Sequence, residues 1–339
     1  MNSTEVVLGI DVGNNDTKGS YVSIPSGYAV QKHQGMALNN EYMIYNGKYY
    51  VSVNDRFPYV KDKTVDEHMY ILTLMAIVKD IEAMFADLSP EERKRRIAQI
   101  KTVHLGIGLP PTHMSMLSQS YLNYYRIMSN NGANGPVKIT YNGNKYEFNF
   151  GKLRAYPQNY AAIATYQMPD NSLLKKYDTY RMVDIGGYTV DVVSMIPNIG
   201  AAGSKPDPKD SFSLELGINK FIESMIPIID RETGLTLQRM VIVDILMGRP
   251  TALDDTVKTM VLDYAEDWTN DMLNTIANEG VNFKAYPTLF MGGGSMLLMP
   301  YIKKSSVLGL TEMLPGTKRN ANAYRKLLSL EIERSAKGV

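Results

Sequence analysis

The stretch EVVLGIDVGNNDTK occupies residues 5–18, and the stretch RMVDIGGYTVDVV occupies residues 181–193. Each opens with a short apolar run typical of a buried strand, and each run leads through an aspartate into a glycine-containing turn. Strand-like alternation resumes after the turn, over residues 17–24 in the first copy and 189–196 in the second. This weak internal repeat predicts two related α/β domains whose turns oppose each other across a shared cleft.

The first turn carries the residue types that hold a phosphate. Gly13 can adopt a positive φ and lets the backbone approach an anion closely. Asp11 can hold a hydrated Mg²⁺ ion, and Lys18 can place a positive charge near the phosphates. Backbone N–H groups of the turn can bind phosphate together with the polar side chains Asn14, Asn15 and Thr17. Taken alone, such a turn also fits an ordinary hairpin.

The second turn repeats this chemistry and a third glycine motif follows it. Asp184 ends an apolar run and is expected to point toward the cleft. The binding residues predicted after it are Gly186, Gly187, Tyr188 and Thr189. Farther along, Gly292, Gly293, Gly294 and Ser295 follow another apolar run, which suits close packing of the backbone against a flat ring or a phosphate. Two Asp-Gly turns in one chain are a much stronger indication than either alone.

The remaining pattern indicates helices and hairpins around these motifs. Apolar residues at helical spacing predict helices at about 65–87, 113–128, 217–230, 234–247, 253–279 and 319–335. Ser89-Pro90-Glu91-Glu92 is a capping box that starts a further helix. Hairpins are predicted at Asn46-Gly47 and Asn142-Gly143. Residues 198–210 are predicted to be a loop and residues 283–291 a strand.

The composition excludes several classes of protein. The chain has 339 residues, of which 44% are hydrophobic and 21% charged, as in a globular protein of about two domains. With no cysteine, disulfides and thiolate chemistry are excluded, and the four histidines form no metal-binding pair. The net charge of +1 and the absence of a basic stripe argue against direct nucleic-acid binding. No signal peptide or membrane-spanning run is visible, so we expect a cytoplasmic protein without a membrane partner.

These motifs resemble those of the superfamily of actins, sugar kinases and heat-shock-chaperone ATPases. The turn at 11–17 resembles its first phosphate motif, the turn at 184–191 its second, and Gly292–Gly294 its adenosine motif. The resemblance covers nearly the whole chain. It implies an α/β, actin-like (ribonuclease H-like) fold with a nucleotide cleft between two duplicated domains. We expect residues 1–165 with the C-terminal helix 317–339 to form domain I, and residues 166–316 to form domain II.

Four further segments resemble the plasmid-segregation actins of the ParM and Alp type. They are HLGIGLP at 104–110, YPQNYAA at 156–162, LELGI at 214–218 and NANAY at 320–324. The third resembles a glycine-headed helix near the nucleotide, which adds Gly217 and Lys220 to the expected binding residues. Two departures stand out: Asn159 occupies a position where relatives often have glycine, and Asn14-Asn15 replaces small residues.

The resemblance implies ATP, or GTP, bound with Mg²⁺ and hydrolysed. Such catalysis is mainly positioning and charge neutralisation. We expect Gln158 to orient the attacking water, and Asp11 and Asp184 to hold Mg²⁺ through its water shell. Lys18 would neutralise charge on the phosphates. Gln158 could instead merely cap a helix, and Asp184 could be a structural turn residue.

The expected function is nucleoside triphosphate hydrolysis coupled to filament assembly. The partners implied by the resemblance are further copies of the chain, added head to tail, and a DNA-binding adaptor that links the filament to a plasmid. A sugar or small-acid kinase of the same fold is the first alternative, although such kinases usually need an aspartate base near the position of Gln158. A non-polymerising nucleotide-binding regulator and an unrelated two-domain binding protein are the others.

Overall fold

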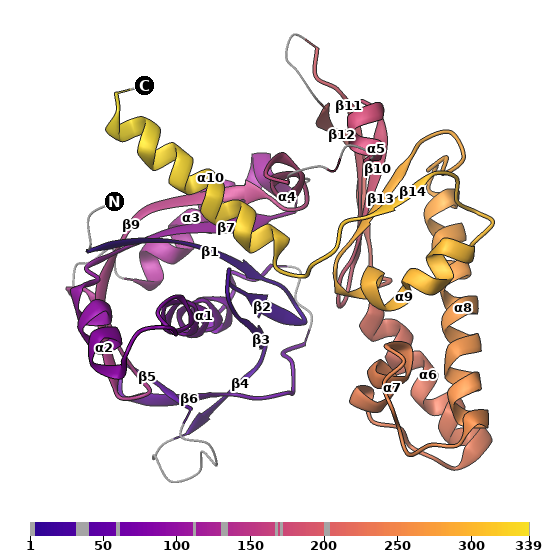
Figure 1. Cartoon of the computed structure of the whole chain (residues 1–339), viewed down its shortest axis with the longest axis horizontal. Coiled ribbons are helices and arrows are strands. Elements are labelled where there is room, and N and C mark those ends of the chain that lie inside the picture. The colour runs from indigo at the N-terminus through magenta and orange to yellow at the C-terminus, as the bar shows by residue number, and fades with distance from the viewer. Residues whose placement is uncertain are drawn as a thin grey trace. The chain divides into compact units, whose positions relative to one another are not determined.

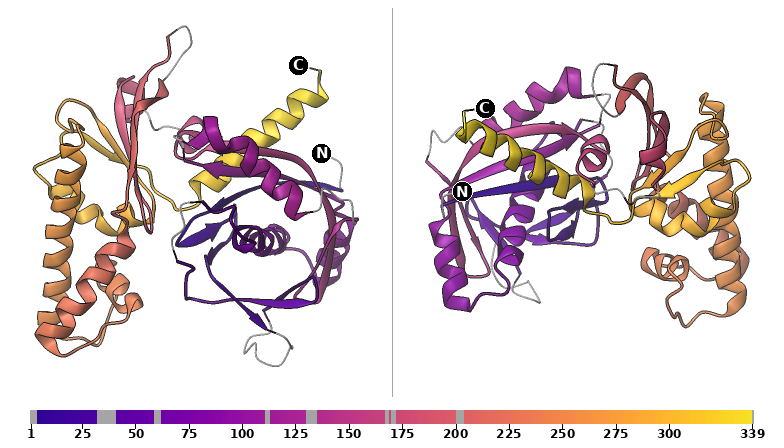
Figure 2. Two further views of the ribbon diagram at one scale, coloured as in Figure 1. Left: turned by 180° about the vertical axis from the view of Figure 1, so that it is seen from behind. Right: turned by 45° about the horizontal axis from the view of Figure 1, so that its top comes forward.

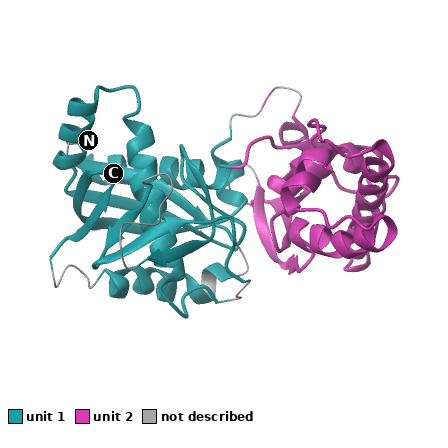
Figure 3. Cartoon of the chain, turned by 90° about the horizontal axis from the view of Figure 1, so that it is seen from below, with its two compact units in different colours: residues 1–166, 318–339 teal, residues 167–317 magenta. Residues whose placement is uncertain are grey.

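The computed structural model describes residues 4–31, 41–58, 62–110, 113–129, 135–166, 169, 172–199 and 204–338. The chain divides into two compact units (Figure 1; Figure 3). Unit 1 comprises residues 1–166 and 318–339, and unit 2 comprises residues 167–317. Unit 2 is therefore inserted into unit 1 in sequence, and the C-terminal segment returns to unit 1.

Unit 1 is built on a sheet with the order β3-β2-β1-β7-β9-β8-β5-β6-β4. Its strands are β1 (Glu5–Val12), β2 (Asp16–Lys18), β3 (Ser23–Pro25), β4 (Tyr28–Gln31), β5 (Met43–Tyr45), β6 (Lys48–Ser52), β7 (Thr102–Leu109), β8 (Val137–Tyr141) and β9 (Asn144–Pro157). Strand β7 lies between β1 and β9 and runs parallel to both. The hairpins predicted at Asn46-Gly47 and Asn142-Gly143 are confirmed, and both asparagines have a positive φ, of 49° and 48°.

The helices of unit 1 are α1 (His68–Met84), α2 (Pro90–Gln99), α3 (Met114–Met128), α4 (Tyr160–Ala164) and α10 (Arg319–Ala336). Figure 1 shows α1 end-on, with β1 to β3 on one side and β5 and β6 on the other. Accordingly, α1 is buried on nearly all sides. The predicted start of α2 is confirmed, because Ser89 Oγ accepts a hydrogen bond from Glu92 N at 3.3 Å.

Helix α10 packs directly on glycines of β1 and β7. A Cβ at Gly9 would lie 2.6 Å from Arg325 N and closer still to Ala321 O. A Cβ at Gly106 would lie 2.9 Å from the Cβ of Tyr324. Figure 2 shows α10, in yellow, lying along the strands of unit 1. The glycines therefore allow the helix to approach the backbone of the sheet more closely than any side chain would permit.

Unit 2 is built on a sheet with the order β12-β11-β10-β13-β14. Its strands are β10 (Tyr180–Ile185), β11 (Val190–Pro197), β12 (Ser204–Leu214), β13 (Thr288–Met291) and β14 (Thr311–Met313). Its helices are α5 (Leu173–Lys176), α6 (Ile218–Thr233), α7 (Arg239–Leu246), α8 (Asp255–Asn278) and α9 (Gly293–Lys304). Val183 and Ile185 of the sheet share one apolar core with Phe221 of α6 and Val261 of α8.

The predicted internal repeat is confirmed by the strand pairing inside each unit. In unit 1, β1 is antiparallel to β2 and parallel to β7. In unit 2, β10 is antiparallel to β11 and parallel to β13. The motif turn thus occupies the same topological position in both units, between the first strand of the repeat and its antiparallel neighbour.

Two segments of unit 2 differ from prediction. Within the predicted loop 198–210, residues 204–210 belong to β12, and residues 200–203 lie outside the described residues. Strand β12 is at the sheet edge, where Pro206 and Pro208 are tolerated. The strand predicted over 283–291 begins only at Thr288, because Asn282 Oδ1 accepts hydrogen bonds from two backbone N–H groups and forms a turn.

The alternation at residues 17–24 is interrupted in unit 1. It forms the two short strands β2 and β3, separated by a loop at residues 19–22. The buried Asp80 carboxylate of α1 accepts hydrogen bonds from Ser20 N, Tyr21 N and Val22 N at 3.0, 2.7 and 3.1 Å. Helix α1 therefore fixes the loop that follows the first motif turn.

Candidate functional site

The two motif turns have the same geometry. Asp11 pairs across the strands with Lys18, and Asp184 pairs with Asp191, so both turns close after the same number of residues. Gly13 N donates a hydrogen bond to Asp16 O at 3.1 Å, and Gly186 N donates to Thr189 O at 2.9 Å. Each turn therefore places its aspartate at the end of a strand and its glycine at the first turn position, as the sequence repeat predicts.

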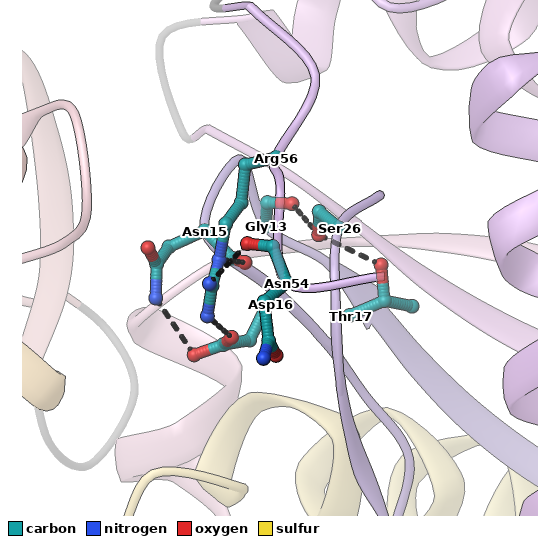
Figure 4. A network of polar contacts seen from close by, with 7 residues as sticks. All are labelled: Gly13, Asn15, Asp16, Thr17, Ser26, Asn54 and Arg56. Carbon is teal, nitrogen blue, oxygen red and sulfur yellow. Dashed lines mark hydrogen bonds and ion pairs between the residues drawn. The ribbon is translucent and has the colours of Figure 1, made fainter. Parts of the chain in front are cut away.

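The first turn is supported from behind by two buried hydroxyl groups (Figure 4). Ser26 Oγ donates a hydrogen bond to Gly13 O at 2.6 Å and lies 3.0 Å from Thr17 Oγ1. Because Ser26 has a single proton and uses it on Gly13, Thr17 is the donor to Ser26. The Thr17 side chain is fully buried, so its hydroxyl lies inside unit 1 and stabilises the turn from there.

Arg56 binds the other side of the same turn (Figure 4). Its Nε donates to Asn15 O at 3.1 Å, and its Nη2 forms an ion pair with Asp16 Oδ1 at 3.2 Å. Its Nη1 donates to Asn54 O at 2.6 Å. The guanidinium thus fixes the backbone and one side chain of the turn while placing a positive charge beside it.

Further polar groups lie at the first turn. Lys63 Nζ donates a hydrogen bond to Val12 O at 2.6 Å, next to Asp11. Lys18 and Asn14 are partly exposed. Together with Arg56, the two lysines place three positive charges at a turn that carries the two carboxylates Asp11 and Asp16, which suits an anionic ligand bound with a cation.

The Asp11 carboxylate is bound by two side-chain amides. Gln158 Nε2 donates to Asp11 Oδ1 at 3.1 Å, and Asn320 Nδ2 lies 3.4 Å from Asp11 Oδ2. Asp11 is 8% exposed. Because an ionised carboxylate only accepts hydrogen bonds, the Gln158 amide nitrogen must face Asp11. Gln158 Oε1 is then the atom available to accept a hydrogen bond from a water.

The residue after Gln158 has an unusual backbone. Asn159 has φ 63° and ψ −54°, and Tyr160 N donates to Gln158 O at 2.6 Å, which makes residues 158–160 a γ-turn of the rare, strained form. Asn159 is 1% exposed, and its Oδ1 has no hydrogen-bond partner in the part of the chain that the structure describes. The positive φ explains why glycine is common at this position in the segregation actins that the segment resembles.

The second turn is joined to the start of α6. Gly217 N donates to Tyr188 O at 2.9 Å, and Ile218 N donates to Gly186 O at 3.0 Å. A Cβ at Gly217 would lie 2.5 Å from the carbonyl group of Gly187, so only glycine fits there. The first N–H groups of α6 are therefore engaged by the turn itself. Lys220, in the first turn of the helix, is exposed.

The third glycine motif lies against the second turn. Gly292 has φ 91°, and a Cβ there would clash with Asp184 Oδ1 and lie 2.7 Å from Ile185 O. A Cβ at Gly294 would lie 2.8 Å from Ile185 O. Unit 2 thus brings together Asp184 and the glycines at 186–187, 217 and 292–294. Ser295 is fully buried and its Oγ donates to Met291 O at 2.5 Å, whereas Thr189 Oγ1 donates to Asp191 Oδ2 at 3.3 Å.

Three residues at the first turn were not predicted to act there. They are Arg56, Lys63 and Asn320, the last of which appeared only within a resemblance motif. Each reaches the turn from a segment distant in sequence, and no local pattern marks Arg56 or Lys63. Only Asn320 was marked in the sequence, because residues 320–324 at the predicted start of the last helix resemble a segment of the segregation actins.

Comparisons with known proteins bear on the fold of the chain. The sequence model of the family described as archaeal actin homologue MreB-like, C-terminal, matches residues 182–304. No curated protein matches the sequence. A 15-stranded ParM filament from Clostridium botulinum matches with a TM-score of 0.70 and 16% identity, over 96% of this chain and 99% of that one. The chain has an actin-like fold.

Two further solved structures similar to this actin-like chain contain a nucleotide. An archaeal actin homologue in complex with ADP has a TM-score of 0.67 and 18% identity, over 96% of this chain and 99% of that chain. ParM from Bacillus thuringiensis with ATP has a TM-score of 0.62 and 15% identity, over 97% of this chain and 99% of that chain. Across the described ranges, no helix of this actin-like chain has the length and apolar character needed to cross a membrane.

Proposed function

We propose that this chain is a ParM-type ATPase that binds Mg-ATP at its motif turns, hydrolyses it and assembles head to tail into filaments. The proposal is supported by two turns of matching geometry, each with an aspartate near the end of its first strand and a glycine at the first turn position. The ADP and ATP named for two structural neighbours add to that support. GTP is the competing nucleotide.

The contact between Gln158 and Asp11 is the observation that carries the hydrolytic part. Gln158 Nε2 is held by Asp11 Oδ1 at 3.1 Å, which fixes the side chain and presents Oε1 as an acceptor. A water that donates a hydrogen bond to Oε1 has its lone pairs directed elsewhere, which suits in-line attack on a phosphoryl group. Gln158 thereby orients the nucleophile, while Lys18 and the turn N–H groups neutralise charge on the phosphates.

The carboxylates fit a magnesium ion of the kind that nucleotides carry. Among the described residues, no three His, Cys, Asp or Glu side chains gather into a group that could enclose a metal. Each unit instead offers one motif aspartate, Asp11 or Asp184. Mg²⁺ keeps most of its waters and takes few protein ligands alongside substrate phosphates, so one carboxylate per turn suits it. The ion would supply charge neutralisation at the phosphates.

Filament formation is proposed from the fold. The C. botulinum relative is a ParM filament, and a further match is a filament of Alp12. Head-to-tail contacts that do not close generate open polymers, and hydrolysis would weaken them if ATP and ADP favour different conformations. We further propose that a DNA-binding adaptor links the filament to a plasmid, and that the protein acts in the cytoplasm to segregate it.

Replacing Gln158 tests the hydrolytic role. Gln158→Ala should lower kcat for ATP hydrolysis by about 100-fold, because the water loses its orienting acceptor. The dissociation constant of Mg-ATP should stay within about threefold of the parent value. Gln119→Ala is the matched control, since Gln119 is an exposed glutamine of α3 and should leave both quantities unchanged. Equal kcat in Gln158→Ala and the parent protein would reject the assignment.

Assembly is tested by light scattering and electron microscopy at rising protein concentration with Mg-ATP and with Mg-ADP. Filaments that appear above a critical concentration, and disassemble after hydrolysis, are expected. ADP release that depends on an added sugar or small acid, without a concentration threshold, would instead identify a kinase. Nucleotide binding without turnover or filaments would identify a regulator.

A further inference from the structure

Asn320 contacts both Asp11 and the turn at residues 158–160. It lies at the start of α10, is 8% exposed and belongs to the segment that returns to unit 1. Its Oδ1 accepts a hydrogen bond from Asn159 N at 2.9 Å, and its Nδ2 lies 3.4 Å from Asp11 Oδ2. One side-chain amide therefore contacts both the turn that carries Gln158 and the carboxylate that Gln158 binds.

The chemistry of the neighbours permits only one orientation of this amide. Asn159 N–H can only donate, and ionised Asp11 can only accept. A flipped Asn320 would place its NH₂ group against a donor and its oxygen against a carboxylate. The side chain is thus fixed at both ends, and it defines the distance between the turn and the aspartate.

The turn also requires such a contact. A γ-turn with positive φ at a residue other than glycine costs of the order of 1–3 kcal/mol, and it persists only where the surroundings hold it. Asn320 binds the N–H of its central residue. Without this hydrogen bond, Asn159 would be free to relax toward negative φ, and the direction of the adjoining Gln158 side chain would change with it.

We propose that Asn320 is a positioning residue for the hydrolytic step. It holds Asp11 and the turn at 158–160 at a fixed distance and orientation, so that Gln158 presents Oε1 to the attacking water. The inference rests on the proposed ATPase function. It assigns no contact between Asn320 and the nucleotide, so it predicts a loss in kcat with nucleotide affinity retained.

Two substitutions separate the two contacts of Asn320. Asn320→Ala removes both. Asn320→Asp retains an acceptor for Asn159 N–H but replaces the donor to Asp11 by a second carboxylate. An acidic residue in the first turn of a helix is favourable, so Asn320→Asp should preserve α10. Asn322→Ala is the matched control, because Asn322 is an exposed asparagine of the same helix.

The assay measures kcat, KM and the dissociation constant of Mg-ATP for each variant, with Tm as a check on folding. We expect kcat to fall by about 10–100-fold in Asn320→Ala and Asn320→Asp, as for other residues that orient a ligating carboxylate. The dissociation constant should stay within about threefold, and Asn322→Ala should match the parent protein.

Parental kcat in either folded Asn320 variant would overturn the inference. So would a loss that appears wholly in nucleotide affinity. If Asn320→Ala does not fold, Asn320→Asp decides the question, since it keeps the hydrogen bond to the strained turn. An absence of ATP hydrolysis by the parent protein would refute the proposed function itself, and that result is distinguishable from failure of the inference.

Discussion

Replacing Gly9 by alanine should destabilise unit 1 strongly, because the added methyl group has no space. Its Cβ would lie 2.6 Å from Arg325 N and closer still to Ala321 O, inside the 3.4 Å at which ordinary van der Waals contact begins. Both atoms belong to the backbone of α10, so neither can rotate away. Overpacking costs about 1–3 kcal/mol, and we place this site at the upper end, at about 3 kcal/mol.

Thermal unfolding followed by circular dichroism measures this effect. For a unit of this size, about 3 kcal/mol corresponds to a fall in Tm of about 6–12 °C. Gly293→Ala is the control, because a Cβ there meets nothing within 4 Å and alanine reduces the entropy of the unfolded chain. A Tm for Gly9→Ala within about 2 °C of the parent value would refute the close approach of α10 to β1.

Three other substitutions test separate contacts. Asp80→Ala should lower the free energy of unfolding by about 3 kcal/mol, since three backbone N–H groups at residues 20–22 lose their acceptor; urea denaturation measures this, and an unchanged midpoint would contradict it. Arg56→Gln should raise KM for Mg-ATP by about tenfold, because the first turn loses a cation; steady-state kinetics with unaltered KM would exclude that role. Hydrogen bonding from Arg154 lowers the pKa of Glu331, so the stability it contributes is complete above the ordinary value of 4.5 and is lost as the pH falls below it. Glu331→Gln should flatten the fall of Tm in acid, and identical pH profiles would count against this pairing.

Much of the fold could be predicted because its determinants are local. The order strand, aspartate, glycine-containing turn, strand occurs at residues 6–23 and 181–196 and predicted the repeat, and the strand pairing confirms it. Helix α2 starts at Pro90 because its N-cap Ser89 and the Glu92 N–H that donates to Ser89 Oγ lie within four residues of each other. The actin-like fold was predicted because these short-range motifs, in their order along the chain, resemble those of the actin superfamily.

The candidate site was harder to predict from the sequence, because residues from distant segments hold its turn in place. Arg56 reaches Asp16 across 40 positions, and Asn320 reaches Asp11 across 309. A sequence motif also does not show which of its side chains are buried. Thr17 was expected to contact the ligand, whereas its hydroxyl is buried and hydrogen-bonded within unit 1. Asp80 likewise interrupts an apparently continuous strand through contacts with residues 20–22, about 60 positions away.

The return of the chain to unit 1 after residue 317 sets an order during protein synthesis. The ribosome completes all of unit 2 before α10 emerges, so the nascent polypeptide exposes the glycines of β1 and β7 without the helix that covers them. Until translation reaches Asn320, the γ-turn at 158–160 lacks the hydrogen bond that holds it, and Asp11 lacks one of its two amide partners. A chain shortened by a protease before Asn320 would lack the same two contacts, so its turn at 158–160 would lose this hydrogen bond in the same way.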